Sequence, residues 1–120
     1  NMSGSMPCSA SEVQIETLLN QLISQLKRAE QWSVSPPSEW AMQSEAPFAC
    51  DRMAFAQWLQ FIFIPKMTSL LQAQLPLPRR MTLLPMAQEW AKELKCDRQY
   101  TTAILDTINK IDLIFSDDAL

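Results

Sequence analysis

The sequence predicts an all-α fold, a single-domain bundle of about four helices joined by two long proline-containing connections. Apolar residues recur at helical spacing in several segments, whereas no Asn-Gly or Asp-Gly hairpin signal and no run of strict alternation indicates a strand. The chain has 120 residues, 48% of them hydrophobic, which is enough for one domain with its own core. Eight prolines and a single glycine, Gly4, make proline the main residue that ends or bends these elements.

The first helix is predicted over residues 11–32. Ser11 with Gln14 three residues later has the spacing of a capping box, in which each side chain bonds the other residue's backbone amide. Residues 1–10 are expected to be disordered or a remnant of expression, so that residues 11–120 form the helical domain. The stripe that faces the core consists of apolar residues at helical spacing: Ile15, Leu18, Leu19, Leu22, Leu26 and Ala29.

A proline-rich connection is predicted over residues 33–50, with at most one short turn of helix around Ser38–Met42. It carries Trp40 and Phe48, two aromatic side chains that are costly to leave in water. We therefore expect both side chains to pack back on the bundle and to hold the connection in place.

The central helix is predicted to begin at or just after Asp51 and to run through Gln72. It is apolar on nearly every face, which is typical of a helix contacted from several sides. Pro65 removes one backbone donor, and its ring clashes with the preceding turn. The central helix should therefore be kinked or divided near Ile64.

Two further helices complete the predicted bundle. An extended, proline-bearing stretch over residues 73–85 leads to a short helix over residues 85–95, and a last helix follows over residues 97–115. On the last helix, Asp112 lies beside the inward-facing stripe. We expect its carboxylate to be paired with a group at a helix boundary, such as an arginine side chain.

The composition excludes most familiar catalytic machinery. There is no histidine to serve as a base or metal ligand, and no glycine after Gly4 to bring backbone close to a phosphate. Cys8, Cys50 and Cys96 lack the spacing of metal or redox motifs and are interpreted as free thiols. The carboxylate pairs lie on faces that are expected to be solvated. From the sequence we therefore expect that the protein is not an enzyme and that it has no cofactor or metal site.

The charge balance argues against nucleic acid as a directly bound partner. The chain has 10 basic and 13 acidic side chains, a formal net charge of −3. Residues 52–98 are an exception, because they carry seven basic and three acidic side chains.

The first dozen residues contain no apolar signal region, and no apolar stretch approaches the ~20 residues of a membrane-spanning helix. We expect a cytoplasmic protein that makes no membrane contact.

The middle of the chain carries a pattern of residues at fixed spacing. With its flanking residues it comprises Trp32, Ser44, Pro47-Phe48, Asp51, Met53, Trp58-Leu59-Gln60, Ile64-Pro65-Lys66-Met67, Leu70-Leu71, Leu77-Pro78, Pro85, Ile111-Asp112 and Phe115. The pattern resembles the YqcC-like family of small bacterial proteins over residues 13–120, except between Arg79 and Arg98. This resemblance implies a helical bundle whose activity is not established. Because the family's genes often neighbour a tRNA pseudouridine synthase gene, it also implies a role near tRNA modification.

Our leading hypothesis is a non-enzymatic protein that acts by binding an unknown protein partner, for which an RNA-modification enzyme is one candidate. Gln60 and Lys66 either reach into a pocket beside the Pro65 kink or lie on the narrow solvent-exposed side of the helix. The candidate interaction surface lies around this kink and consists of Phe48, Asp51, Trp58, Gln60, Pro65 and Lys66.

Two alternative functions remain open. One is a small-molecule sensor with its pocket at the Pro65 kink. The other is an RNA-binding accessory factor that uses basic side chains of the 52–98 segment, namely Arg52, Lys66, Arg79, Arg80, Lys92 and Lys95.

Overall fold

The computed structural model describes residues 10–45, 53–77 and 81–116, and these residues form helices and no strand. The helical elements in chain order are α1 (Ala10–Arg28), α2 (Glu39–Met42), α3 (Phe55–Trp58), the π-helical segment η2 (Leu59–Phe63), α4 (Ile64–Gln72), α5 (Leu84–Lys92) and α6 (Arg98–Ser116). The predicted all-α fold is therefore confirmed, with the four main helices formed by α1, the continuous stretch α3–η2–α4, α5 and α6.

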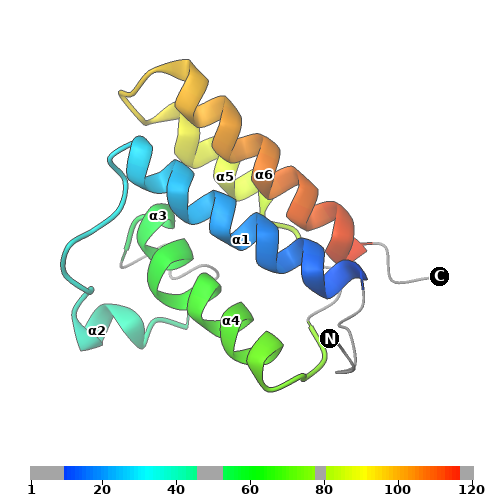
Figure 1. Ribbon diagram of the computed structural model, residues 1–120. Coiled ribbons are helices and arrows are strands. Elements are labelled where there is room, and N and C mark those ends of the chain that lie inside the picture. The colour runs from blue at the N-terminus through cyan, green and yellow to red at the C-terminus, as the bar shows by residue number, and fades with distance from the viewer. Residues whose placement is uncertain (1–9, 46–52, 78–80, 117–120) are drawn as a thin grey trace.

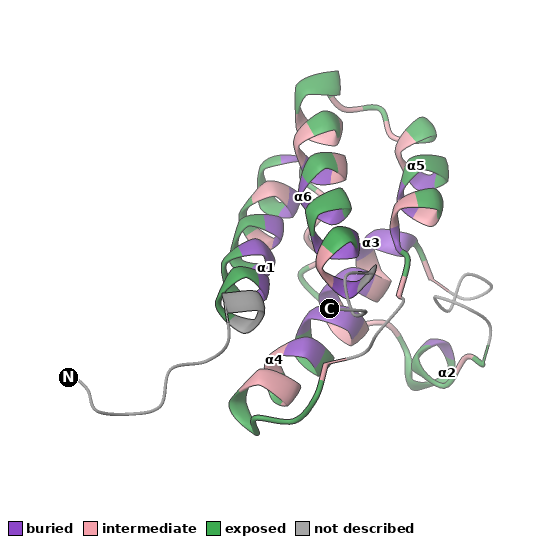
Figure 2. Cartoon of the chain, turned by 90° about the vertical axis from the view of Figure 1, so that its right-hand side faces the viewer, coloured by how far each residue is buried: buried purple, intermediate pink, exposed green. Residues whose placement is uncertain are grey.

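The two 19-residue helices α1 and α6 form the longest packing contact of the bundle. They run antiparallel and side by side, so that the start of α1 lies next to the end of α6 (Figure 1). On the other side of α6 lies α5, which places α6 between α1 and α5 (Figure 2). The central helix contacts α1 through α4 and α5 through α3, and it therefore bridges the two outer helices.

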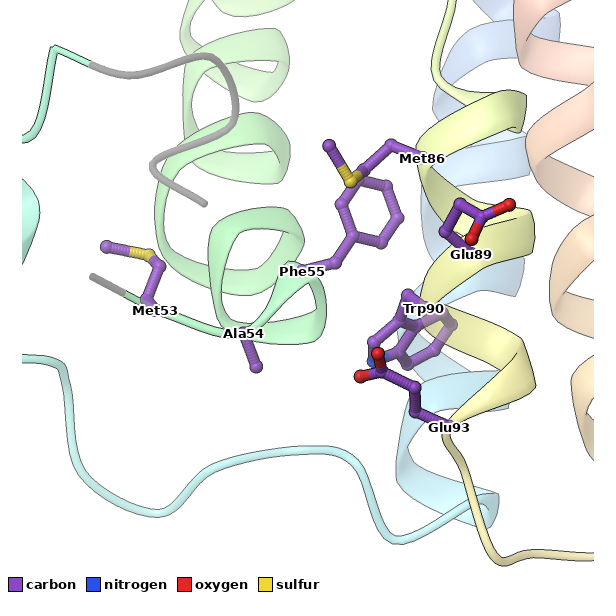
Figure 3. A pocket seen from close by; sticks show the side chains of 7 residues that line it. All are labelled: Met53, Ala54, Phe55, Met86, Glu89, Trp90 and Glu93. Carbon is purple, nitrogen blue, oxygen red and sulfur yellow. The ribbon is translucent and has the colours of Figure 1, made fainter. Parts of the chain in front are cut away.

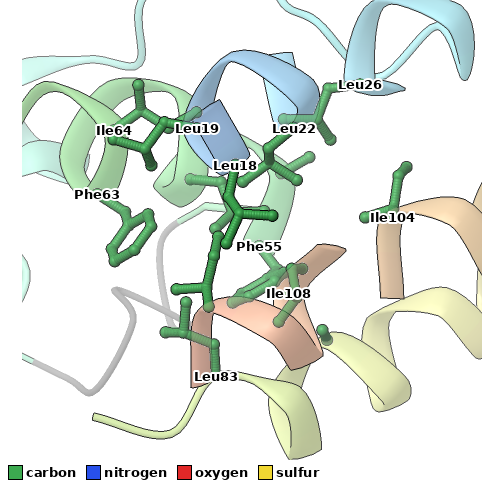
Figure 4. Close-up of a cluster of buried hydrophobic side chains, with 14 of the residues drawn as sticks. Leu18, Leu19, Leu22, Leu26, Phe55, Phe63, Ile64, Leu83, Ile104 and Ile108 are labelled. Carbon is green, nitrogen blue, oxygen red and sulfur yellow. The ribbon is translucent and has the colours of Figure 1, made fainter. Parts of the chain in front are cut away.

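The hydrophobic core lies where these helices face one another (Figure 4). All six residues of the stripe predicted for the first helix are buried. Burial of a side chain of this size contributes about 1.5–3 kcal/mol before the entropy cost of folding. The largest fully buried side chains come from every main helix except α5 and from the turn that precedes it: Ile15, Leu22, Leu26, Leu59, Phe63, Met67, Leu83, Ile104, Ile108 and Ile111.

The predicted interruption near Ile64 takes the form of a π-helical segment rather than a break. Residues 59–63 form the wide turn η2, and the backbone amide of Ile64 donates to the carbonyl of Leu59, five residues earlier. This segment ends two residues before Pro65, which has no amide to donate and whose ring would crowd a regular turn. The helix therefore continues from Phe55 to Gln72 around its proline.

The central helix begins later than Asp51. Its first residue is Phe55, and the side-chain oxygen of Gln57 accepts the backbone N–H of Ala54 at 3.2 Å, which satisfies one donor at the helix start. Asp51 itself lies outside the described residues.

The connection after α1 contains the predicted short helix, but its tryptophan does not pack inward. In α2 the Oγ of Ser38 accepts the backbone N–H of Ala41 at 3.2 Å, an ordinary N-cap. Ala41 is the residue of α2 that is buried, and the neighbouring Trp40 is 62% exposed. The expectation for Trp40 is wrong because a four-residue helix turns only one position inward, and alanine occupies it. Phe48 lies outside the described residues.

Two helices end in a motif that usually uses glycine. After α1, the amide of Gln31 donates to the carbonyl of Leu26 at 2.8 Å, and after α4, the amide of Leu75 donates to the carbonyl of Leu70 at 2.9 Å. Each of these hydrogen bonds encloses one residue in the left-handed region. This residue is Glu30, with φ 61°, after α1 and Gln74, with φ 57°, after α4. Both are Schellman endings formed without glycine.

The start of α5 is capped by a side chain from α6. Asp112 is buried, and its two carboxylate oxygens accept the backbone N–H of Leu83 at 2.8 and 2.9 Å. Its Oδ2 also accepts the N–H of Leu84 at 2.7 Å. Leu83 is the residue at the N-cap position and has no side-chain acceptor, so the carboxylate supplied by α6 satisfies the first amides of α5. The expected partner at a helix boundary is therefore confirmed, but it is the backbone at the start of α5 and not an arginine side chain.

The environment of Asp112 acts on its protonation in two directions. Burial raises the pKa of the carboxyl above its usual value of 3.8, and the amides of Leu83 and Leu84 lower that pKa by stabilising the charged form. The net direction is upward.

We predict that glycine at the two left-handed positions stabilises the protein. Glu30→Gly and Gln74→Gly should each raise the free energy of unfolding by about 0.5–1 kcal/mol, because a residue with a Cβ is strained at positive φ. Urea unfolding monitored by circular dichroism measures the change. Glu16→Gly, within α1 and also exposed, is the matched control and should be destabilising. Destabilisation by all three changes would contradict the assigned helix endings.

We predict that Asp112→Ala lowers the free energy of unfolding at pH 7 by about 2–3 kcal/mol, because it leaves the buried amides at the start of α5 without an acceptor. Asp106→Ala is the control on the same helix, since its exposed ion pair with Lys110 should contribute little. Equal effects of the two changes would show that the cap is unimportant.

The pH dependence of the Asp112→Ala effect tests the direction of the pKa shift. With a raised pKa, the folded protein binds this proton more tightly than the unfolded chain does. The stability advantage of the wild type over the variant should therefore fall as the pH rises from 3.8 through the folded-state pKa, and it should be level above that. An advantage that grows over this window would mean that the amide donors outweigh burial.

Candidate functional site

The residues of the predicted interaction surface differ in accessibility. Trp58 is half-buried, Gln60 is 8% exposed, and Pro65 and Lys66 are exposed, all on the continuous helix from Phe55 to Gln72. Phe48 and Asp51, the other two members, lie outside the described residues. Among the described members, a partner would thus reach Pro65 and Lys66 directly and Trp58 in part.

Gln60 is committed to a backbone contact far away in sequence. Its side-chain oxygen accepts the N–H of Ser33 at 2.8 Å, and its side-chain nitrogen donates to the carbonyl of Ser33 at 2.9 Å. The amide thereby pairs with both backbone groups of one residue in the connection between α1 and α2, much as a neighbouring strand would. The buried side chain therefore does not lie on a solvent-exposed face, and it ties this connection to the central helix.

Trp58 belongs to a chain of aromatic contacts. Its ring stacks on Phe55 with the centroids 5.8 Å apart and on Phe63 with the centroids 5.5 Å apart. Phe55 also meets Trp90 of α5 at 5.7 Å, and Phe63 meets Phe115 of α6 edge-on at 6.4 Å. These contacts join the central helix to α5 and α6, and each such pair adds about 0.5–1.5 kcal/mol beyond area burial.

A cavity of about 300 Å³ lies between the start of the central helix and α5 (Figure 3). We name it the α3–α5 cavity, and it is lined by Met53, Ala54, Phe55, Met86, Glu89, Trp90 and Glu93. Its aromatic and methionine side chains suit an apolar or cationic group, since two carboxylates accompany them. One of these, on Glu89, is held by the ammonium group of Lys92 at 3.0 Å. Pro65 does not line this cavity.

A second concave surface lies between the two long helices. This α1–α6 groove has a volume of about 370 Å³ and is lined by Val13, Gln14, Thr17, Leu18, Lys110, Leu113 and Ile114. Val13 is 51% exposed and Leu113 is 58% exposed, so two large aliphatic side chains from neighbouring helices are accessible here. Helical periodicity does not reveal this surface, because Val13 and Leu113 lie outside the buried stripes.

The basic side chains of the described residues lie on several different helices. Lys92 pairs with Glu89, Lys110 lies 3.2 Å from Asp106, and Lys27 lies 5.3 Å from the ring centre of Trp32. Of the residues considered for RNA binding, Lys66 and Lys95 are exposed, whereas Arg52, Arg79 and Arg80 lie outside the described residues.

The described part of the chain contains neither a cluster of metal-binding side chains nor a membrane-spanning helix. Over residues 10–45, 53–77 and 81–116, no three cysteine or carboxylate side chains come close enough together to hold a metal ion. Within the same residues, no helix has the length and apolarity needed to cross a bilayer.

We predict that Gln60→Ala lowers the free energy of unfolding by about 2–3 kcal/mol, because both backbone groups of Ser33 lose their partner in a partly buried place. Gln57→Ala is the matched control, since Gln57 lies on the same helix and makes a single exposed hydrogen bond. Urea unfolding gives both values. A loss for Gln60→Ala no greater than that for Gln57→Ala would show that the pairing contributes nothing specific.

The chain is similar to several known bacterial proteins. A family model described as "DUF446: tRNA pseudouridine synthase C" matches residues 14–114. An uncharacterized protein of Haemophilus influenzae is 34% identical over 87 residues, which are 72% of this chain and 82% of the relative. YqcC of Escherichia coli, also named as uncharacterized, is 32% identical over 94 residues, which are 78% of this chain and 84% of YqcC.

A longer relative and a solved structure complete the comparison. The tRNA pseudouridine synthase C of Pectobacterium carotovorum is 34% identical over 90 residues, which are 74% of this chain but only 24% of that protein. The solution NMR structure of E. coli YqcC superposes with a TM-score of 0.74 at 29% identity and covers 92% of both chains. Sequence and fold agree with the resemblance carried by the Trp-Leu-Gln and Ile-Pro-Lys-Met residues, and the chain therefore belongs to the YqcC (DUF446) family.

Proposed function

We propose that this protein is a non-enzymatic accessory protein that binds a tRNA pseudouridine synthase. The observation that carries the proposal is the difference in length between its relatives. The match makes up 82% and 84% of the relatives from H. influenzae and E. coli, but 24% of the Pectobacterium protein named tRNA pseudouridine synthase C. The same domain thus occurs both as most of a chain and as a part of a longer chain that carries the enzyme's name.

The link between this domain and the rest of the chain in the longer relative is the reason to expect that the separate domain binds the synthase. Two domains on one polypeptide meet at an effective concentration of about a millimolar, with no need for a strong interface. Where the same domain is a separate chain, a non-covalent interface has to bring it to the enzyme. A protein that works beside the synthase should therefore carry a surface that binds it.

The described surface supports a binding role. Several large apolar side chains are exposed, and such residues are typical anchors of protein interfaces when they lie together. They are Val13, Val34, Trp40, Met42, Leu75 and Leu113. Of the buried polar side chains, those of Gln60 and Asp112 hold backbone groups. Their chemistry therefore serves the fold, which favours binding over catalysis as the proposed activity.

Direct RNA binding is the second candidate function. It is favoured by the excess of basic residues in the 52–98 segment and by the exposure of Lys66 and Lys95. Pairing of Lys92 with Glu89 counts against it. An interaction of this kind would weaken steeply as salt concentration rises.

We predict that the full chain binds the tRNA pseudouridine synthase C of its own organism with a Kd of about 1 μM or tighter. Isothermal titration calorimetry with the two purified proteins measures the affinity, and size-exclusion chromatography with light scattering gives the stoichiometry. A tRNA pseudouridine synthase of a different class from the same organism is the matched control and should not bind.

The outcomes separate the two candidate functions. The absence of heat and of co-elution with about 50 μM of each protein would overturn the synthase proposal. Binding of tRNA by this chain alone, lost between about 50 and 200 mM salt, would instead favour the RNA-binding function.

A further inference from the structure

We infer that the α1–α6 groove is the surface on which the synthase docks, and that it receives an apolar segment of the enzyme. The inference rests on the proposed function and goes beyond it by assigning the binding site. It depends on where the ends of the domain lie, on the composition of the groove and on the neutralised charge at its edge.

The antiparallel pairing of α1 and α6 places both ends of the domain together. The start of α1 lies beside the end of α6 (Figure 1). The family model extends from residue 14 in α1 to residue 114 in α6, so both helices belong to the part shared with relatives. A longer chain that contains this domain must enter or leave it at this end.

The groove lies at the same end. Val13 is three residues from the start of α1, and Leu113 is three residues from the end of α6. About three quarters of the Pectobacterium relative lies outside its match. That part is therefore tethered next to the groove, whichever end of the domain it follows. By contrast, α2 with the exposed Trp40 lies at the opposite side of the bundle from the two ends (Figure 1).

The groove combines apolar and polar side chains. Val13 and Leu113 are exposed, and the buried Leu18 and the half-buried Ile114 also line the groove. Three exposed polar side chains complete its lining: Gln14, Thr17 and Lys110. Protein interfaces likewise combine buried apolar side chains with polar ones.

The charge at the border indicates the chemistry of the occupant. Among the residues that the structure describes, Lys110 is the one charged residue that lines the groove, and it lies 3.2 Å from the carboxylate of Asp106. The groove therefore does not select a strongly acidic or basic partner. It suits two or three neighbouring aliphatic or aromatic side chains, presented for example by an amphipathic helix of the synthase. Such binding should change little with salt, unlike binding to RNA.

The test compares charged substitutions in the groove with the same substitutions elsewhere. Val13→Asp and Leu113→Asp change side chains that are at least half exposed, so the fold should tolerate them. Val34→Asp and Leu75→Asp are the matched controls, because both residues are exposed aliphatic side chains that do not line the groove. We expect each groove variant to weaken binding to the synthase by at least about tenfold and each control to change it by less than about twofold.

A further groove variant is a control for misfolding caused by the aspartate substitutions. Thr17→Arg adds bulk at the exposed border without altering an apolar residue, and it should weaken binding in the same direction. Circular dichroism and thermal unfolding establish that each variant is folded before its affinity is measured. Affinity of the wild type should also change less than about threefold between about 50 and 500 mM salt.

The results distinguish this inference from the proposed function. If the wild type binds the synthase and the groove variants bind equally well, the groove assignment is overturned and the proposed function stands. Loss of binding in Trp40→Ala with full binding in the groove variants would place the site at α2 instead. Groove variants that abolish only self-association of this chain would also overturn the assignment. If the wild type does not bind, both proposals fail.

Discussion

The contact between the Asp112 carboxylate and the first amides of α5 determines how the second half of the bundle is assembled. It joins α6 to the start of α5 through hydrogen bonds of 2.7 to 2.9 Å, and it does so in a buried place where amides without an acceptor would be costly. Leu83, whose amide is held there, is itself fully buried in the core. Once this turn is fixed, Trp90 of α5 reaches Phe55 and completes the contact with the central helix.

Gln60 performs the same task in the first half of the chain. Its side-chain amide pairs with the backbone of Ser33 and holds the connection that follows α1. In both cases a long-range side chain takes over a role that local caps and tight glycine turns often fill. A chain with one glycine, at position 4, has few local ways to end a helix and turn. The left-handed Glu30 and Gln74 show the strain that remains where such a turn is made locally.

Helical periodicity was sufficient to predict the main helices, because an apolar stripe at 3.6-residue spacing has few alternatives. It could not identify the partners of Gln60 and Asp112, which lie 27 and 29 residues away and are fixed only by tertiary packing. The proline rule located the irregularity before Pro65, but a kink and a π-helical turn satisfy the same steric demand. Trp40 was misplaced because burial tendency alone does not say which residue of a short helix faces inward. The groove with the exposed Val13 and Leu113 is formed by two helices together, so the apolar stripe of a single helix could not predict it.

The pairing of α1 with α6 connects the fold to the match with part of a longer relative. A domain whose first and last helices lie antiparallel presents both ends on one side, so another domain can be joined there without disturbing the core. The 92% mutual coverage with E. coli YqcC indicates that this arrangement also exists where the domain is most of the chain. A surface close to these ends can then make the same contacts whether or not a covalent link is present, because the link would only raise the local concentration of its occupant. The α1–α6 groove lies close to these ends, whereas α2 with the exposed Trp40 and Met42 does not.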